Sequence, residues 1–291
     1  MMTDVQRAAL TEGERVGAGY VLVPPRTMLA GPGGARVGRR AGGSLEFRDH
    51  RDYEPGDDLR HLDWSVLARS DKLAVKQFHE EISPFVDIIV DGSRSMKLKE
   101  RGALALAALL AAAVRNSGCP YVLWLARERL EPIARGAARP SDWNGLAFDH
   151  PASPAEAIVR GARSLRPLSV RILISDLLWE GTPEQVAGAL ATGASSTVIV
   201  QVLAAEDVNP DLRGGWRIVD VESGEWQEVF VDAVAEERYR DALMRHRAMW
   251  DEGARHARAT VVRCVAEELE RQLVFDELAA AEILKPAWFR S

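Results

Sequence analysis

"VDIIVDGSRSM", residues Val86 to Met96, is the stretch that decides the fold. Six mostly apolar residues end in Asp91, which is followed by a glycine and by two serines on either side of an arginine. A buried strand that stops at Asp91 would bring Asp91, Ser93 and Ser95 into one loop at its carboxyl end. We therefore expect a cluster of oxygen ligands at the end of a buried strand.

Similar apolar runs recur after residue 85 and alternate with helical patterns. The strand-like runs cover 85–91, 121–126, 169–176, 196–203 and 259–265. The helical patterns cover 99–118, 153–165, 182–194, 233–255 and 266–284. Short apolar strands separated by helices of this length indicate a parallel sheet with helices on both faces. The fold class we predict is α/β, with a doubly wound and mainly parallel sheet.

Two regions depart from this alternation. Residues 214–232 form two alternating segments around Ser223 and Gly224, which predicts an inserted β-hairpin. Residues 1–84 are glycine-rich and charged, with strand candidates at 19–24 and 72–81. We therefore expect an N-terminal, β-containing appendage over 1–84 and a sheet domain with a hairpin insertion over 85–291.

Composition narrows the function classes. The net charge of −6 argues against a general nucleic-acid or membrane-surface binder. Cys119 and Cys264 lie in separate apolar stretches, which indicates two reduced and buried thiols. No stretch has the length of a signal peptide core or a membrane span, so we expect a cytoplasmic protein.

A second aspartate ends another predicted strand. Ligands of open parallel sheets bind beyond the carboxyl ends of the strands, and both 85–91 and 169–176 end in aspartate, at Asp91 and Asp176. Carboxylates and hydroxyls without histidine or thiolate suit Mg²⁺ or Mn²⁺, with water in the remaining positions. The alternative is structural, because Asp and Ser also cap free N–H groups where a turn leads into a helix.

The pattern Asp-x-Ser-x-Ser resembles the metal-ion-dependent adhesion site of von Willebrand factor A domains. That family's middle ligand is a threonine at the start of a helix. Here the best match is Ser153 in "HPASPAE", at the end of the stretch 134–153 that we expect to be a loop, and Ser141 is a poorer alternative. The resemblance thus implies a metal held by Asp91, Ser93, Ser95, Ser153 and Asp176.

A charged segment before the sheet domain carries a longer resemblance. "EFRDHRDYEPGDDLRHLDWSVLARSDKLAVKQFHEE", residues 46–81, closely resembles the signature of the bacterial family called domain of unknown function 58. "RRAGGSLEF", "DGSRSM", "LISDLL" and "RIVDVESGE" also fit that family. The matching signature positions are Arg51, Tyr53, Pro55, Gly56, Asp57, Arg60, Asp63, Trp64 and Arg69. We expect the apolar side chains of Tyr53, Leu59, Leu62, Trp64 and Leu67 to anchor this segment against the sheet domain.

That resemblance implies partners. Members of the family carry a von Willebrand A-like domain after the signature and are typically encoded beside MoxR-type AAA ATPases. Many have N-terminal membrane helices that this chain lacks, which favours a soluble form. The role of the Arg51 to Arg69 signature would be structural or partner-binding.

Three function classes compete. The first is a Mg²⁺-dependent interaction module that acts with a MoxR-type ATPase on an unknown client protein, in maturation or assembly of another complex. The alternative is a metal-dependent phosphatase or hydrolase using Asp91. That enzyme would require a second acid at Ser93, and no nucleophile constellation accompanies the site, so we do not expect an enzyme. Nucleic-acid binding would depend on one short basic cluster at Arg36, Arg39 and Arg40, and we expect none.

Overall fold

The computed structural model describes residues 2–23, 45–55, 57, 62–70, 72–80, 84–136, 138–179, 181–210, 212–273 and 276–287. The chain divides into two compact units. The sheet unit contains residues 1–27 and 84–291, and the signature unit contains residues 28–83. The predicted division at residue 84 therefore needs a correction, because the first 27 residues belong to the sheet unit.

A six-stranded sheet forms the centre of the sheet unit. Its strands are β4 (Val86–Asp91), β5 (Tyr121–Ala126), β6 (Leu130–Gly136), β7 (Val170–Ser175), β8 (Ser196–Leu203) and β11 (Thr260–Val265). The strand order is β11-β8-β7-β4-β5-β6, and only the β5–β6 pair is antiparallel. The predicted mixed α/β fold with a mainly parallel sheet is confirmed. The chain winds outward from β4 in one direction and from β7 in the other, so the order reverses between these two strands.

Strand β6 is not among the predicted strands, and its last three residues lie in the stretch 134–153 that we expected to be a loop. It is an edge strand that pairs with β5 alone, and most of its residues are partly or fully exposed. Pro132, Glu131 and Arg135 lie within it. Proline and charged residues are tolerated at a sheet edge, where they also hinder pairing with another chain. The apolar pattern used to find the central strands is therefore weak here.

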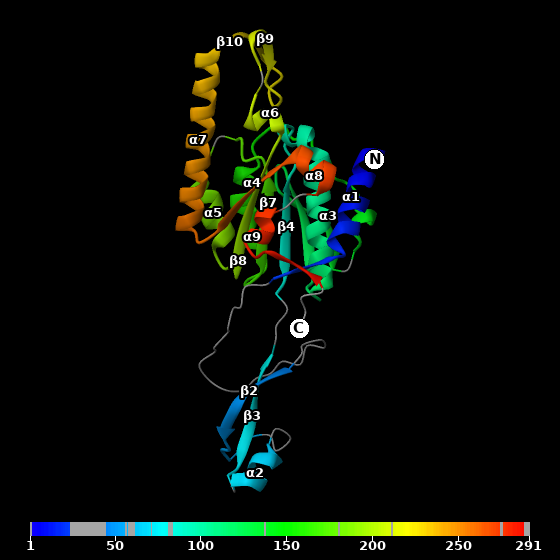
Figure 1. Ribbon diagram of the computed structural model, residues 1–291, viewed down its shortest axis with the longest axis vertical. Coiled ribbons are helices and arrows are strands. Elements are labelled where there is room, and N and C mark those ends of the chain that lie inside the picture. Colours follow the sequence, from blue (N-terminus) through cyan, green and yellow to red (C-terminus); the bar gives the residue numbers. More distant parts are fainter. Residues whose placement is uncertain are drawn as a thin grey trace. The chain divides into compact units, whose positions relative to one another are not determined.

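Helices cover both faces of the sheet (Figure 1). On one face α3 (Glu100–Asn116) packs with Ile88 and Val90 of β4 in one core cluster. On the other face α5 (Pro183–Ala191) and α7 (Ala233–His256) pack with Ile89 in a second cluster, which includes Trp250. Successive residues of β4 thus point to opposite faces, and both faces are buried, which explains its nearly continuous apolar run.

Helix α1 (Asp4–Gly17) lies against α3 and supplies a further layer to the sheet unit. Two glycines allow the close approach. A Cβ atom on Gly13 would lie 2.1 Å from the main-chain oxygen of Ala105, and one on Gly17 would lie 2.4 Å from that of Leu109. Glycine has no Cβ atom, so the backbone of α1 can lie directly against the backbone of α3 at these two points.

The remaining elements of the sheet unit surround this core. They are β1 (Tyr20–Leu22), η2 (Ser95–Lys99), η3 (Pro140–Asp142), α4 (Ala155–Gly161), η4 (Ala162–Ser164), α6 (Ala205–Val208), β9 (Gly214–Val219), β10 (Trp226–Val231), α8 (Ala266–Gln272), α9 (Asp276–Ala280) and β12 (Leu284–Pro286). Strands β9 and β10 form the predicted hairpin. The predicted helix over 266–284 is divided into α8 and α9, since Leu273 has φ of 46° and ends α8. Strand β1 pairs with β12. Within the described residues, no helix combines the length and apolarity needed to cross a membrane.

The signature unit contains β2 (Leu45–Asp52), α2 (Trp64–Ser70) and β3 (Ala74–Glu80), with β2 and β3 antiparallel. Polar signature residues organise its turns. Asp57 accepts hydrogen bonds from Arg51 at 2.7 Å and from the Glu54 amide at 2.9 Å, and Asp63 accepts one from the Ser65 amide at 2.8 Å. These contacts are structural.

The apolar anchors expected in this segment behave differently from one another. Within the signature unit Leu62 is buried, whereas Trp64 is 65% exposed, and the expected anchoring of the segment against the sheet domain stays a prediction. Trp64 is the first residue of α2 and directly follows Asp63. Gly56, Leu59 and Arg60 of the segment, like the basic cluster at Arg36, Arg39 and Arg40, lie outside the described residues.

Candidate functional site

Asp91 is the last residue of β4, and Asp176 directly follows β7, so the two aspartates lie at the switch in strand order. Asp91 is fully buried. One of its carboxylate oxygens accepts a hydrogen bond from the Ser93 amide at 2.8 Å, and the other accepts one from the Ser175 hydroxyl at 2.6 Å. These bonds hold the carboxylate in a single orientation at the point where sheets of this class bind ligands.

The loop after Asp91 places two hydroxyls together. The Oγ atoms of Ser93 and Ser95 lie 3.1 Å apart, and Ser93 is 3% exposed. His150 holds the loop from the other side, because its amide donates to the Gly92 carbonyl at 3.2 Å and its carbonyl accepts from the Arg94 amide at 2.9 Å. Asp91 and the two predicted serines therefore form one cluster.

Asp176 already has a cationic partner. The Lys99 ammonium group lies 3.0 Å from the carboxylate of Asp176 and 3.0 Å from that of Asp207, and it donates to the Ser95 carbonyl at 3.3 Å. Lys99 is 2% exposed and Asp176 is fully buried. The second carboxylate oxygen of Asp176 accepts from the Leu178 amide at 3.0 Å. Sequence reasoning missed Lys99, which neutralises part of the charge that a metal ligand at Asp176 would offer.

Electrostatics at the strand ends favour an additional cation. Burial, together with the negative charge of Asp176, raises the pKa of Asp91 to about 7, although hydrogen bonds from Ser175 and Ser93 act to lower it. Burial works against the charged form of Lys99, but the negative charges of Asp176 and Asp207 raise its pKa overall. Lys99 therefore stays charged at neutral pH, whereas Asp91 is about half protonated there, and no Lys or Arg among the described residues forms an ion pair with it.

Ser153 has a different position from the one expected. Its hydroxyl accepts a hydrogen bond from the Ala155 amide at 3.2 Å at the start of α4. Among the described residues, no hydrogen bond joins Ser153 to Asp91 or to the serine pair after it. Ser141 lies in η3, and its amide donates to Glu14 of α1. Ser153 thus has the local role of a helix-start residue, and its predicted role as a metal ligand stays a prediction.

The hairpin contributes a carboxylate that sequence reasoning also missed. Oε1 of Glu222 accepts a hydrogen bond from the Ser95 amide at 3.1 Å, and the Arg94 guanidinium donates to the Glu222 carbonyl at 2.9 Å. Asp220 shapes the turn by accepting from the Glu222 amide at 2.7 Å, and Gly224 has φ of 76°. "VDVESGE" was recognised as a family motif, but only the structure reveals which element this turn touches.

The oxygen atoms of Asp91, Ser93 and Ser95 supply some of the ligands that a hard cation such as Mg²⁺ requires. Within the described ranges, no group of three or more His, Cys, Asp or Glu side chains could by itself hold a metal ion. The cluster instead combines one uncompensated carboxylate, Asp91, with the hydroxyls of Ser93 and Ser95. Mg²⁺ binds such oxygen donors through one or two carboxylates and keeps several waters. The residues present are therefore compatible with Mg²⁺ in chemistry, with Asp176 in a supporting position.

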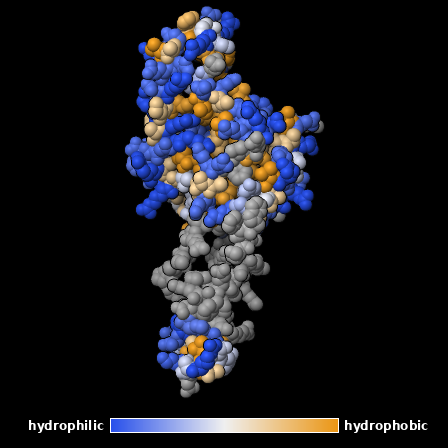
Figure 2. Space-filling model, viewed as in Figure 1, coloured by the Kyte–Doolittle hydropathy of each residue, from blue (hydrophilic) through white to orange (hydrophobic). Residues whose placement is uncertain are grey.

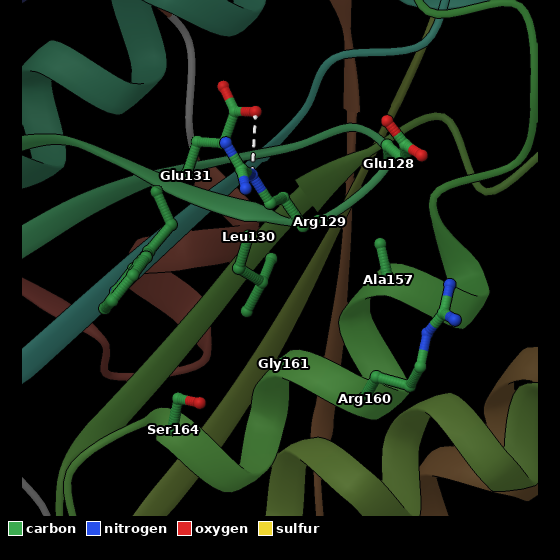
Figure 3. A pocket seen from close by; sticks show the side chains of 9 residues that line it. Glu128, Arg129, Leu130, Glu131, Ala157, Arg160, Gly161 and Ser164 are labelled. Atoms are coloured by element: carbon green, nitrogen blue, oxygen red, sulfur yellow. Dashed lines mark hydrogen bonds and ion pairs between the residues drawn. The ribbon is translucent and has the colours of Figure 1, made fainter.

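A surface hollow lies elsewhere on the sheet unit, beside the turn from β5 to β6 and helix α4 (Figure 3). It has a volume of about 630 Å³, and its lining includes Trp124, Glu128, Leu130 and Arg160. None of the predicted site residues lines it. The hollow is thus a separate feature from the strand-end cluster.

The fold and the cluster define the chain as a mixed α/β protein with a polar site at the switch point of a mainly parallel sheet. The chain belongs to the family described as protein of unknown function DUF58, whose model matches residues 49–249. Two mycobacterial relatives, the uncharacterized proteins Rv1480 of Mycobacterium tuberculosis and Mb1516 of Mycobacterium bovis, are each 31% identical over 241 residues. These matches cover 74% of this chain and 73% of the relatives.

Solved structures give weaker similarity. The conserved hypothetical protein BatB from Bacteroides thetaiotaomicron is 16% identical, with a TM-score of 0.37, and the match covers 68% of this chain and 98% of BatB. An aerotolerance-related membrane protein from Bacteroides fragilis is 15% identical, with a TM-score of 0.35, and the match covers 68% of this chain and 99% of that protein.

Proposed function

We propose that the protein is a Mg²⁺-dependent interaction module with a von Willebrand A-like site, acting with a MoxR-type AAA ATPase on a client protein during maturation or assembly of another complex. The observation that carries the metal site is the meeting of buried Asp91 with the hydroxyls of Ser93 and Ser95 at the switch point. The ATPase partnership comes from the family resemblance. No catalytic role is assigned to these residues.

In this proposal Asp91, Ser93 and Ser95 bind the cation, which is Mg²⁺ or Mn²⁺. Asp176 and Ser153 contribute through water, since the Asp176 carboxylate binds Lys99 and the Ser153 hydroxyl accepts a hydrogen bond from the Ala155 amide. When bound, the cation would supply a positive centre that attracts an acidic side chain of a partner. Asp91, Ser93 and Ser95 would hold the cation, and the acidic side chain of the partner would take one of its remaining coordination positions.

Exposed apolar side chains near the site support an interaction role. Both faces of the β9–β10 hairpin carry them, and Trp216, Ile218, Trp226 and Phe230 are between 41% and 73% exposed. The hairpin lies at one end of the sheet unit, where the space-filling view shows apolar groups among polar ones (Figure 2). Aromatic residues are enriched in protein interfaces, and exposed apolar patches often mark them.

The test measures Mg²⁺ and Mn²⁺ binding to the full chain by calorimetry. We expect the Asp91→Asn variant to lose binding, because Asp91 is the uncompensated carboxylate of the cluster. Asp149→Asn removes the same charge from a nearby exposed position and should bind as the parent does. Equal binding by the Asp91→Asn variant would refute the metal assignment.

The partner test uses the purified MoxR-type ATPase from the same organism. Association should occur with Mg²⁺, fail in excess chelator and fail with Asp91→Asn. Binding that persists in chelator would move the interaction surface to the Arg51 to Arg69 signature. Metal-dependent phosphate ester hydrolysis that is lost in Asp91→Asn would instead support the phosphatase alternative. Both oxygens of Asp91 accept hydrogen bonds inside a buried site, which disfavours a nucleophilic role.

A further inference from the structure

The Glu222 carboxylate at the hairpin tip is unevenly satisfied. Oε1 accepts the hydrogen bond from the Ser95 amide, while Oε2 is buried and has no hydrogen-bond partner in the described part of the chain. A buried carboxylate oxygen without a donor or a cation carries a desolvation cost. A positive ion at this position would remove that cost.

The cations already present are used elsewhere. Lys99 has three N–H donors, and its three contacts are Asp176, Asp207 and the Ser95 carbonyl. Arg94 contacts the main-chain carbonyl of Glu222, not its carboxylate. The described contacts therefore leave no ammonium or guanidinium donor for Oε2.

The same carboxylate lies against the predicted cation ligands. The amide that binds Glu222 belongs to Ser95, whose hydroxyl lies 3.1 Å from that of Ser93, and the amide of Ser93 donates to Asp91. Glu222, which comes from the hairpin, thus contacts the loop that follows Asp91. The Glu222 carboxylate is therefore bound to Ser95, the residue that also supplies a hydroxyl to the proposed cation site.

We propose that Glu222 is a further ligand of the cation bound by Asp91, Ser93 and Ser95, supplied by the hairpin itself. This inference rests on the proposed metal site and deepens it. The internal carboxylate takes the coordination position that an acidic side chain of a partner would use. A partner that binds through the metal must therefore displace Glu222, and the hairpin tip becomes the element that controls access.

Mn²⁺ titration of the full chain, followed by calorimetry and by electron paramagnetic resonance, tests the assignment. Glu222→Gln keeps the oxygen that accepts from Ser95 and replaces the charged Oε2, so we expect affinity to fall by about tenfold or more, as for loss of groups that support a metal site. Glu225→Gln makes the same charge change in the same turn at an exposed residue and should stay within about twofold of the parent. Glu222→Ala should weaken binding in the same direction.

Hydrogen exchange supplies a second measurement that does not depend on partner binding. Saturating Mn²⁺ should slow exchange of the amides in residues 220–225 in the parent and in Glu225→Gln, and should not slow it in Glu222→Gln. Unchanged or tighter Mn²⁺ binding by Glu222→Gln, with normal hairpin protection, would overturn the inference. If Asp91→Asn still lost binding in that case, the proposed metal site would stand; if the parent bound no metal at all, the proposed function would fail first.

Discussion

Replacing Lys99 by methionine should destabilise the protein far more than its position in a short loop helix indicates. The ammonium group is buried and binds Asp176 at 3.0 Å, Asp207 at 3.0 Å and the Ser95 carbonyl at 3.3 Å. Methionine fills similar space but leaves Asp176, which is fully buried, without its cation. Breaking a buried ion pair from one side costs about 3–5 kcal/mol, and Asp207 contributes less because it is partly exposed.

Urea unfolding at pH 7 in the presence of chelator measures this cost. Arg101→Met is the control, because Arg101 lies two residues further along in α3, its side chain is 53% exposed and its partner Glu270 is partly exposed, so this ion pair should be worth about 1 kcal/mol or less. Adding Asp176→Asn to Lys99→Met removes the stranded charge and should restore about 1–3 kcal/mol. Equal effects of Lys99→Met and Arg101→Met would refute the idea that the buried ion pair of Lys99 supports the site.

Two other features of the structure give testable outcomes. Gly13→Ala should lower the free energy of unfolding by about 1–3 kcal/mol, because its Cβ would meet the Ala105 oxygen. Gly188→Ala, in α5 with open space around it, should raise that free energy by about 0.5–1 kcal/mol; the same sign for both in urea unfolding would contradict the packing argument. Burial raises the pKa of Cys264 to about 12, so at pH 8 its thiolate is scarce and iodoacetamide should label it much more slowly in native protein than in urea, as read by mass spectrometry. Equal labelling rates would show that the thiol is accessible.

The central sheet could be predicted because its signal is local and strong. Each buried strand, such as β4 and β7, is a short apolar run, and strands that are covered on both faces give such runs without alternation. The proximity of the two strand-end aspartates could be predicted from the sequence, since parallel strands present their carboxyl ends on one edge of the sheet. The cluster of Asp91, Ser93 and Ser95 could also be predicted, because these residues lie within five positions of one another in the sequence.

Other features lacked a local signal. Edge strand β6 is half-exposed and contains proline, so its pattern resembles a loop. Helix α1 contains Gly13 and Gly17, which lower its helix propensity. These glycines are needed for the close contact with α3, which lies far along the chain. Lys99 could not be predicted as buried because lysine is almost never fully buried unless it is paired, and its partners come from distant segments.

Glu222 shows the same limit at the site, since it lies 127 residues from its contact at Ser95. Among the strands that the structure describes, the two strands of the hairpin that carries it pair with each other and with no third strand. Such a sheet is marginally stable alone, so its position depends on neighbouring contacts, which include those of the tip with Arg94 and Ser95 and those of β10 with α7. A change in the charge or partner of Glu222 therefore acts on one of the contacts that position this hairpin, and the exposed aromatic side chains of β9 and β10 would move with it.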